Sequence, residues 1–388
     1  MSEVPNADAP ESTPSLDAQA DNVLVSGNQA HLRGGGSWPR FATRAKGAHL
    51  WDAEGRRYVD LFLASGGVIL GHGAEPVARA VTNKALSGAG MSLRPVEEVE
   101  LASWLRRMLP WLARWIMVKT GSEAAHLATR IAREYTGRRQ ILSLGYHGWL
   151  PPFSSQEGHD ACDLIVGPWR LKELLEIMTE RQHELAAIVI SPHPAVPSGE
   201  FYSRLRIAAQ RIGALFIMDE IKTGFRFAWP TLSSEYELEP DVLILGKALA
   251  NGYPLAALGG REEVFSSVAS ARIYSSTASE AIALAAARAC TTQLAAGGHA
   301  RYAEVASTTF ERIRAILPGD DQVVVVGRPT LARLHFRSAA LADHVGAQMV
   351  ERGVLWHPHD DLLVSTAHAE PGVLDEVVRA LASSLASR

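Results

Sequence analysis

The feature that most constrains the fold is an alternation of short apolar runs and segments with helical periodicity between residues 74 and 245. The apolar runs are almost continuous, as in parallel strands that are covered on both faces. Repeated units of this kind are typical of a doubly wound α/β domain with a mostly parallel sheet. The expected strands are 115–118, 140–144, 188–190, 215–218 and 242–245, and the expected helices are 74–87, 96–109, 122–136, 170–182 and 201–213.

The pattern changes after about residue 278. Two Ala-rich helical segments lead to two strands, a helix, a short strand and a last helix, which favours a smaller α+β domain. His357-Pro-His359-Asp-Asp361 resembles a metal cluster at first sight, but we interpret it as a loop before a strand at 362–364 and expect no metal. The expected helices here are 278–296 and 300–316, and the expected strands are 322–326 and 331–336.

The N-terminal part divides into a tail and a segment that joins the small domain. Residues 1–22 are acidic and rich in Pro, Ser and Ala, so they bury too little apolar surface to become ordered, and we expect a disordered tail. Two β-prone runs flank Asp52-Ala-Glu-Gly55 and predict a hairpin. We expect the small domain to comprise 286–388 together with 23–59, and the large domain to comprise 60–285.

Composition excludes several classes of protein. The 388 residues carry 38 basic and 42 acidic side chains, a formal charge of −4, which argues against nonspecific binding to nucleic acid. No apolar run approaches the roughly 20 residues that cross a bilayer, and residues 1–29 lack the basic residues of a targeting signal. Two cysteines, Cys162 and Cys290, make no disulfide framework, so we expect a cytoplasmic protein.

Two of the predicted strands end in ionisable residues. Strand 215–218 runs into Asp219, and strand 242–245 runs into Gly246 and Lys247. In open α/β sheets ligands bind at the carboxyl ends of strands, so a carboxylate and an amine are expected at the same edge. For this pair alone, a simple salt bridge or two solvated strand ends is the favoured explanation.

Two further segments suggest a flat, anionic ligand. Lys119-Thr-Gly-Ser-Glu123 opens a predicted helix, where Gly121 allows close approach, Ser122 is a suitable N-cap, and free N–H groups attract an anion. Gly145-Tyr-His-Gly148 follows another strand and places Tyr146 where it can stack on a ring. Plain helix capping and core packing are the simpler explanations of each segment alone. The Gly-rich fingerprint of dinucleotide sites is missing, which disfavours an NAD-dependent dehydrogenase, whereas pyridoxal phosphate (PLP) fits all four features.

The ordered motifs resemble those of class III PLP-dependent aminotransferases, in the branch of glutamate semialdehyde aminomutase. The resemblance covers nearly all of residues 33–380 and implies the PLP-dependent aspartate-aminotransferase fold. The matching stretches are Thr43-Arg-Ala-Lys-Gly-Ala-His-Leu-Trp-Asp52, Leu70-Gly-His72, Thr120-Gly-Ser-Glu-Ala124, Asp219-Glu-Ile-Lys-Thr-Gly-Phe-Arg226 and Pro240-Asp-Val-Leu-Ile-Leu-Gly-Lys247.

The resemblance implies roles for the residues at these positions. Lys247 would form the Schiff base with PLP, and the amine released by an incoming substrate would move a proton. Asp219 would pair with the pyridinium nitrogen and keep it protonated. The other cofactor contacts would be Gly121 and Ser122 at the phosphate, Tyr146 on one face of the ring, and Ile221, on the same side of the strand as Asp219, on the other face.

The resemblance also implies contacts from a neighbouring subunit and with substrate. Ser276, with Thr277 beside it, occupies the position that reaches the phosphate of the neighbouring subunit, so a homodimer with shared active sites is implied; a helix N-cap before residue 278 is the alternative. Arg33 matches an arginine that binds a substrate carboxylate in the aminomutase branch, with a solvent-exposed loop arginine as the alternative. Trp149 is a further candidate substrate contact. His147 would pack beside the cofactor and form a hydrogen bond.

Three departures from the aminomutase pattern bear on the reaction. Segments 149–167 and 191–201 are shorter, and 327–354 lacks an insertion found in that branch. A shortened lid suits a transaminase, which must release one product and admit a second substrate. The sequence therefore predicts amino transfer from an amino acid, with glutamate as a candidate, to a non-standard carbonyl acceptor. The alternatives are the aminomutase reaction, decarboxylation, racemisation or epimerisation on the same scaffold, and a PLP-binding regulator without turnover.

Overall fold

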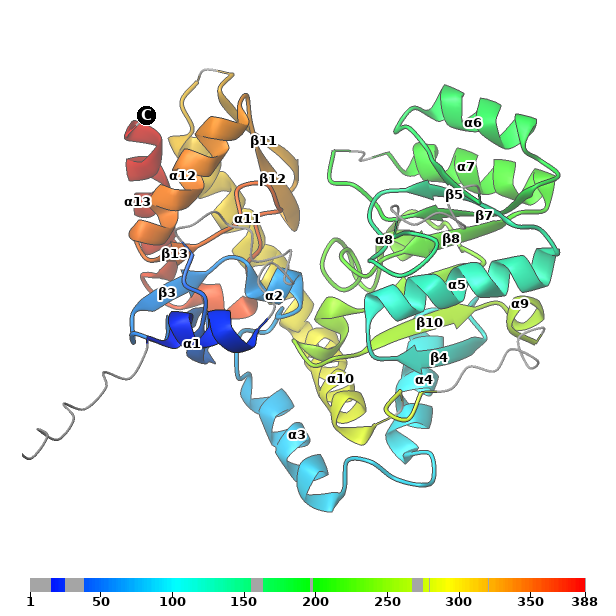
Figure 1. The fold of residues 1–388 in the computed structure, drawn as a ribbon, viewed down its shortest axis with the longest axis horizontal. Coiled ribbons are helices and arrows are strands. Elements are labelled where there is room, and N and C mark those ends of the chain that lie inside the picture. The colour runs from blue at the N-terminus through cyan, green and yellow to red at the C-terminus, as the bar shows by residue number, and fades with distance from the viewer. Residues whose placement is uncertain are drawn as a thin grey trace, which may run out of the picture.

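The computed structural model describes residues 15–24, 38–154, 163–195, 198–266, 275–278, 280–319 and 321–387. These residues form two bodies that lie side by side (Figure 1). The larger body contains a seven-stranded sheet, and the smaller one contains a four-stranded sheet, a two-stranded sheet and the last helices of the chain. Within the described residues, no helix combines the length and the apolar character needed to span a membrane.

The large sheet has the order β4-β10-β9-β8-β7-β5-β6. Strand β10 runs antiparallel to both of its neighbours, and all the other pairs are parallel. The central strands are completely buried, which explains their continuous apolar sequences. The strands are β4 (Arg114–Val118), β5 (Gln140–Leu144), β6 (Leu164–Val166), β7 (Leu185–Ile190), β8 (Leu215–Asp219), β9 (Val242–Leu245) and β10 (Ala256–Gly260).

The predicted doubly wound sheet is confirmed, and the predicted helices are found where the periodicity places them along the chain. Each predicted helix between 74 and 213 is present within one to two residues of its expected ends. Strands β6 and β10 were not predicted, because β6 is short and incompletely buried and β10 is a small-residue run of Ala, Leu and Gly. The helices are α3 (Glu75–Ser87), α4 (Val96–Met108), α5 (Gly121–Thr136), α6 (Leu171–Glu180), α7 (Gly199–Ile212), α8 (Leu232–Glu235) and α9 (Glu262–Ser266).

The smaller body combines the two ends of the chain. Its four-stranded sheet has the order β1-β2-β3-β13, so the N-terminal hairpin pairs with a strand near the C-terminus. A strand expected at 362–364 is not formed, because residue 362 makes only an isolated bridge to residue 332. The elements are β1 (Ala42–Lys46), β2 (His49–Asp52), β3 (Arg57–Asp60), α11 (His299–Ile316), β11 (Val323–Arg328), β12 (Leu331–Phe336), α12 (Ala339–Glu351), β13 (Val354–Leu355) and α13 (Val373–Ala386). Helix α10 (Ala281–Gln293) precedes α11 and packs against α3 and α4 (Figure 1).

Part of the expected disordered tail is helical. Helix α1 (Leu16–Val23) begins at Ser15, whose side chain accepts a hydrogen bond from the backbone of residue 18. Arg40 forms ion pairs with Asp17 and Asp21, at 3.6 and 2.8 Å, and so ties the acidic face of the helix to the chain that follows. Composition alone did not reveal this partner. Residues 1–14 lie outside the described residues.

Candidate active site

The parallel pairing of β8 and β9 brings the two predicted reactive residues to one edge of the sheet. Asp219 is the last residue of β8, and Lys247 comes two residues after the end of β9. Helix α5 begins after β4 and the 145–149 loop begins after β5, so both reach the same carboxyl edge of the parallel strands. The sheet therefore gathers the four segments that the sequence singled out.

The start of α5 is an anion-binding candidate with an unexpected cap. Thr120, not Ser122, is the N-cap, and its hydroxyl and the carboxylate of Glu123 form a reciprocal capping box. This arrangement satisfies the N–H groups of Thr120 and Glu123. Among the described residues, the N–H groups of Gly121 and Ser122 have no acceptor, as expected for the first turn of a helix. They are thus available to an anion.

Two glycines let three segments meet closely at this helix start. A Cβ at Gly121 would lie 2.7 Å from Cδ1 of Ile221, and one at Gly148 would lie 2.2 Å from Oγ of Ser122. A side chain at either position would displace its neighbour. Ile221 was expected on the strand, but β8 ends at Asp219, so Ile221 lies in the turn that follows and packs over the helix start.

Asp219 and His147 form a buried pair. Nδ1 of His147 lies 2.7 Å from Oδ2 of Asp219, and both side chains are almost completely excluded from solvent. The backbone N–H of Ile221 donates to the other carboxylate oxygen at 3.1 Å. An ionised carboxylate only accepts hydrogen bonds, so it would pair with the Nδ1–H tautomer of this imidazole. The sequence suggested a hydrogen bond from His147, but it did not identify Asp219 as the partner.

Lys247 is held by a segment far away in the sequence. Its Nζ donates to the carbonyl oxygen of Ser65 at 2.6 Å, across 182 residues of chain. Burial, followed by the nearby positive charge of Lys222, lowers the pKa of Lys247 to about 8. A larger fraction of this amine is therefore neutral near pH 7.5 than for an ordinary lysine, which suits a nucleophile.

Four charged residues form a network near Lys247 that the sequence did not reveal. Nζ of Lys222 lies 2.6 Å from Oδ1 of Asp360 and 2.5 Å from Oδ2 of Asp361. Arg333 lies 2.9 Å from the other oxygen of Asp361. The network joins the turn after β8 to two segments of the smaller body. We call these four residues the rim network.

The remaining predicted contacts are exposed or outside the described residues. Tyr146 and Trp149 are 76% and 71% exposed. Ser276 and Thr277 are exposed as well, and neither caps the next helix, because Glu280 is the N-cap of α10. The helix-cap alternative for Ser276 is therefore wrong. Arg33 lies outside the described residues.

No metal site is found among the side chains that the structure describes. None of their His, Cys, Asp and Glu residues form a group of three or more placed to hold an ion. His359 instead contacts Asp343 at 2.7 Å, and Asp360 and Asp361 belong to the rim network.

Comparison with known proteins identifies the family. A family model described as Aminotransferase class-III matches residues 32–151 and 157–365. The chain belongs to the class III aminotransferase family. The 2'-deamino-2'-hydroxyneamine transaminase of Streptomyces kanamyceticus is 30% identical over 378 residues, which cover 90% of this chain and 91% of that protein. The glutamate-1-semialdehyde 2,1-aminomutase of Anaeromyxobacter sp. (strain K) is 27% identical over 412 residues, covering 94% and 95%. Relatives therefore include transaminases and aminomutases.

Solved structures confirm the predicted fold. The PLP internal aldimine form of the FumI protein from Sphingopyxis sp. MTA144 superposes with a TM-score of 0.89 at 23% identity, covering 95% of this chain and 94% of that one. An omega-transaminase from Sphaerobacter thermophilus gives a TM-score of 0.88 at 23% identity, with coverages of 95% and 96%. The family and the fold confirm the predicted class of cofactor, because class III aminotransferases are PLP-dependent enzymes.

The chemistry of the gathered residues fits PLP. The two free N–H groups at the start of α5 suit a phosphate, and the buried carboxylate of Asp219 suits a protonated ring nitrogen. The amine of Lys247, with its lowered pKa, suits reaction with an aldehyde. One phosphorylated pyridine aldehyde would use all three groups.

Proposed function

We propose that this protein is a PLP-dependent transaminase that moves an amino group from an amino acid to a non-standard carbonyl acceptor. The observation that carries the proposal is the placement of Asp219 and Lys247 at the carboxyl ends of neighbouring parallel strands. Beside them lies the N-terminus of α5, with two N–H groups available to an anion. Glutamate is the donor that we would test first. We also keep the prediction that the enzyme acts in the cytoplasm.

Each residue of the site has a role that follows from its surroundings. Gly121 and Ser122 hold the phosphate through their N–H groups. The side chain of Ile221 packs directly against Gly121. Asp219 keeps the ring nitrogen protonated, and His147 fixes the orientation of its carboxylate. When bound, PLP supplies an electron sink that stabilises negative charge at the substrate carbon.

Lys247 has two tasks in this proposal. It would hold the cofactor through its amine, and as a free amine it would carry a proton to and from the substrate. A pKa of about 8 allows the amine to act as base and acid near neutral pH. General acid–base help of this kind is worth about 10²–10⁴ in rate.

An exposed apolar patch supports a homodimer with shared active sites. The end of α3 and the start of α4 expose five large apolar side chains: Leu86, Met91, Leu93, Val96 and Val99. The N–H of Ala281 donates to the carbonyl of Ala89 at 2.9 Å, so the Ser276–Thr277 segment lies close to this patch. With a second copy bound there, Ser276 and Thr277 would lie close to the interface, in keeping with the phosphate contact that the family resemblance implies for this position. Patches of this kind mark interaction surfaces.

The substrate is inferred from the relatives. The Streptomyces kanamyceticus relative carries the name 2'-deamino-2'-hydroxyneamine transaminase, and it matches over nine-tenths of both chains. This similarity favours a hydroxylated carbonyl acceptor, with Arg33 and Trp149 as candidate contacts. The runner-up is the aminomutase reaction, because several relatives of comparable similarity carry that name.

Reductive trapping tests the proposal directly. Borohydride added to the PLP-loaded protein should fix the cofactor on the peptide that contains Lys247, and mass mapping would locate it. Donor amino acids are then screened for conversion of the cofactor to its pyridoxamine form by absorbance. Trapping on another lysine would refute the assignment. Efficient conversion of glutamate semialdehyde to aminolevulinate, with no donor forming pyridoxamine phosphate, would favour the aminomutase.

A further inference from the structure

A run of left-handed residues lies opposite Lys247. Leu63, Ala64 and Ser65 have φ angles of 49°, 52° and 57°, and Gly66 follows at 86°. Residues other than glycine rarely adopt this region, and each one costs on the order of 1–2 kcal/mol. Three in succession persist only where the surroundings fix them. We call residues 63–66 the left-handed turn.

The first support of the turn is a carboxylate at its N-terminal side. Oδ1 of Asp60 accepts hydrogen bonds from the N–H groups of Phe62 and Leu63, at 2.9 and 2.8 Å. The other oxygen of Asp60 contacts Nε2 of His72 at 2.8 Å. The side chain of Leu63 is completely buried, so the turn begins in the core.

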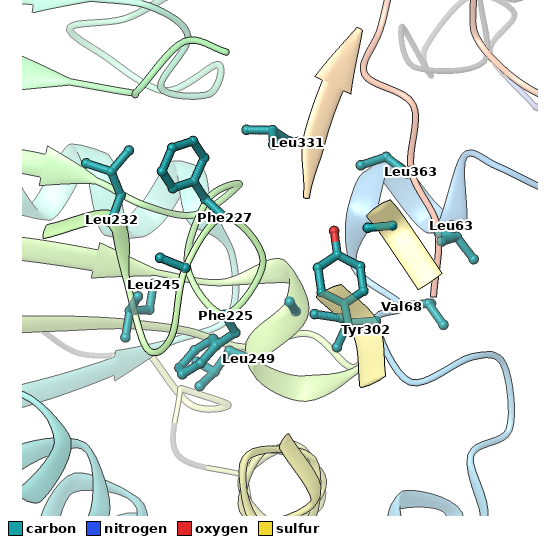
Figure 2. Close-up of a cluster of buried hydrophobic side chains, with 14 of the residues drawn as sticks. Leu63, Val68, Phe225, Phe227, Leu232, Leu245, Leu249, Tyr302, Leu331 and Leu363 are labelled. Atoms are coloured by element: carbon teal, nitrogen blue, oxygen red, sulfur yellow. The ribbon is translucent and has the colours of Figure 1, made fainter. Parts of the chain in front are cut away.

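The second support is the guanidinium of Arg226, which has no solvent exposure. Its Nη2 donates to the carbonyl of Gly66 at 3.0 Å, and its Nη1 donates to the carbonyl of Val364 and the hydroxyl of Tyr302, each at 3.0 Å. Arg226, which follows β8 of the larger body, thus holds both the left-handed turn and two segments of the smaller body. Figure 2 shows a cluster of buried hydrophobic side chains from distant parts of the chain, among them Leu63 of the turn and the neighbours of Arg226 in sequence, Phe225 and Phe227; the cluster also includes Val68, Tyr302, Leu331 and Leu363.

The turn presents two successive carbonyl groups to two cations. Ser65 accepts from Lys247 at 2.6 Å, and Gly66 accepts from Arg226 at 3.0 Å. The guanidinium therefore fixes the peptide unit next to the one that contacts the amine. Beyond burial, the groups that act on the charge of Lys247 are Lys222 and Arg226, which disfavour its protonated form, and Asp360 and Asp361, which favour it.

We propose that the left-handed turn holds the free amine of Lys247 in place, and that Arg226 is the positioning residue that fixes the turn. The proposal rests on the proposed function, in which this amine is released whenever substrate replaces it on the cofactor. One N–H of the free amine would then donate to the Ser65 carbonyl, as it does in the structure. The amine keeps a defined position while it moves a proton, and Arg226 touches neither substrate nor cofactor.

Three variants distinguish the effect of the charge of Arg226, the effect of its hydrogen-bond geometry and a nonspecific loss of stability. Arg226→Met removes the charge and the hydrogen bonds, while Arg226→Lys keeps the charge but loses the planar fork. Tyr302→Phe removes the hydroxyl that accepts from Arg226 and donates to the Thr330 carbonyl, but it leaves the hydrogen bonds of Arg226 to Gly66 and Val364, so it serves as the matched control. The full-length chain, freed of PLP, is labelled with acetic anhydride across pH 6–10, and labelling of the Lys247 peptide is quantified. Amide hydrogen exchange of residues 61–69 reports on the turn.

The variants are expected to differ in both readouts. Arg226→Met should accelerate exchange in the turn at least about tenfold, because buried backbone groups lose a charged partner. It should also reduce labelling of Lys247 near pH 7.5 by roughly threefold, because removing a nearby positive charge raises the pKa of this amine. Arg226→Lys should accelerate exchange but keep the labelling midpoint, and Tyr302→Phe should leave both near wild type.

Two results would overturn the proposal. One is a folded Arg226→Met protein with wild-type exchange and labelling, and the other is a Tyr302→Phe protein that changes as much as Arg226→Met. If Arg226→Met does not fold, the amide exchange of residues 61–69 in Arg226→Lys tests the proposal, and exchange at the wild-type rate would overturn it. Failure of the proposed function would look different, because borohydride would then trap no PLP on Lys247 in the wild-type protein.

Discussion

The buried pair of Asp219 and His147 and the partly buried rim network hold their charges in different ways. The pair lies within the larger body, where each group has its partner at 2.7 Å and solvent is excluded. The rim network joins the two bodies, and the side chains of Lys222, Arg333 and Asp360 are between 23% and 29% exposed. A buried pair is strongly coupled to whatever binds beside it, whereas exposed charges are screened. We therefore expect large effects on chemistry from the first and modest effects on stability from the second.

The largest effect is expected for Asp219→Asn. The amide keeps the shape of the side chain but not the negative charge that stabilises a protonated ring nitrogen. Loss of one preorganised electrostatic group typically costs about 10²–10³ in rate, so the half-reaction with an amino donor should slow by at least about a hundredfold. Single-turnover absorbance measurements on the PLP-loaded protein would provide the rate.

Asp241→Asn is the matched control for this change. Asp241 is a largely buried carboxylate that accepts a hydrogen bond from the backbone of Phe216 at 2.8 Å. It directly precedes β9 and so lies at the opposite end of this strand from Lys247. Its loss should alter stability and leave the half-reaction within a few fold of wild type. If Asp219→Asn were equally active, the role of Asp219 would have to be abandoned.

The sequence predicted the larger body and the reactive residues well because their signals are local. Asp219 and Lys247 directly follow continuous apolar runs, and such runs mark buried parallel strands. The start of α5 was correct, but its cap was not: Thr120 and Ser122 are both good caps, and only the capping box with Glu123 distinguishes them.

Partners far apart in sequence could not be predicted in the same way. Ser65 meets Lys247 across 182 residues, and Lys222 meets Asp360 across 138. Neither pairing leaves a periodic or compositional signal in the chain. The unusual backbone of Ala64 and Ser65 is equally hidden, because these residues carry no preference for left-handed angles.

A smaller effect is expected for His147→Phe. The substitution keeps an aromatic ring beside Phe153, whose centroid lies 4.8 Å away, but removes the hydrogen bond to Asp219. A hydrogen bond to a charged group is worth about 1.5–3 kcal/mol. The half-reaction should therefore slow about tenfold, and PLP should dissociate faster, as measured by dialysis and absorbance.

Phe153→Leu separates the ring contact from the hydrogen bond. This control changes the packing of His147 but leaves its Nδ1 opposite Asp219. We expect its half-reaction to stay close to that of wild type. Equal slowing in both variants would show that His147 acts through packing, and the coupling of the buried pair would need to be reconsidered.

The smallest effect is expected for Asp360→Asn in the rim network. Burial alone would raise the pKa of Asp360, but Lys222 outweighs it and lowers this pKa to about 2. A carboxylate with a lowered pKa stabilises the fold above its unfolded pKa of about 4, and this contribution disappears as the pH falls towards 2. Asp360→Asn should therefore cost about 1 kcal/mol of unfolding free energy at pH 7 and pH 5, and less at pH 3, in urea titrations.

The exposed ion pair of Arg114 and Glu262 provides the comparison for this last prediction. Its side chains are 64% and 54% exposed, and its atoms lie 2.7 Å apart, a distance similar to those in the rim network. Because solvent screens it, Glu262→Gln should cause little measurable loss at any of these pH values. If Asp360→Asn behaved in the same way, the rim network would add nothing to the connection between the two bodies. If only Asp360→Asn lowers the unfolding free energy, then partial burial, and not the distance between the charged atoms, explains why the rim network stabilises the fold.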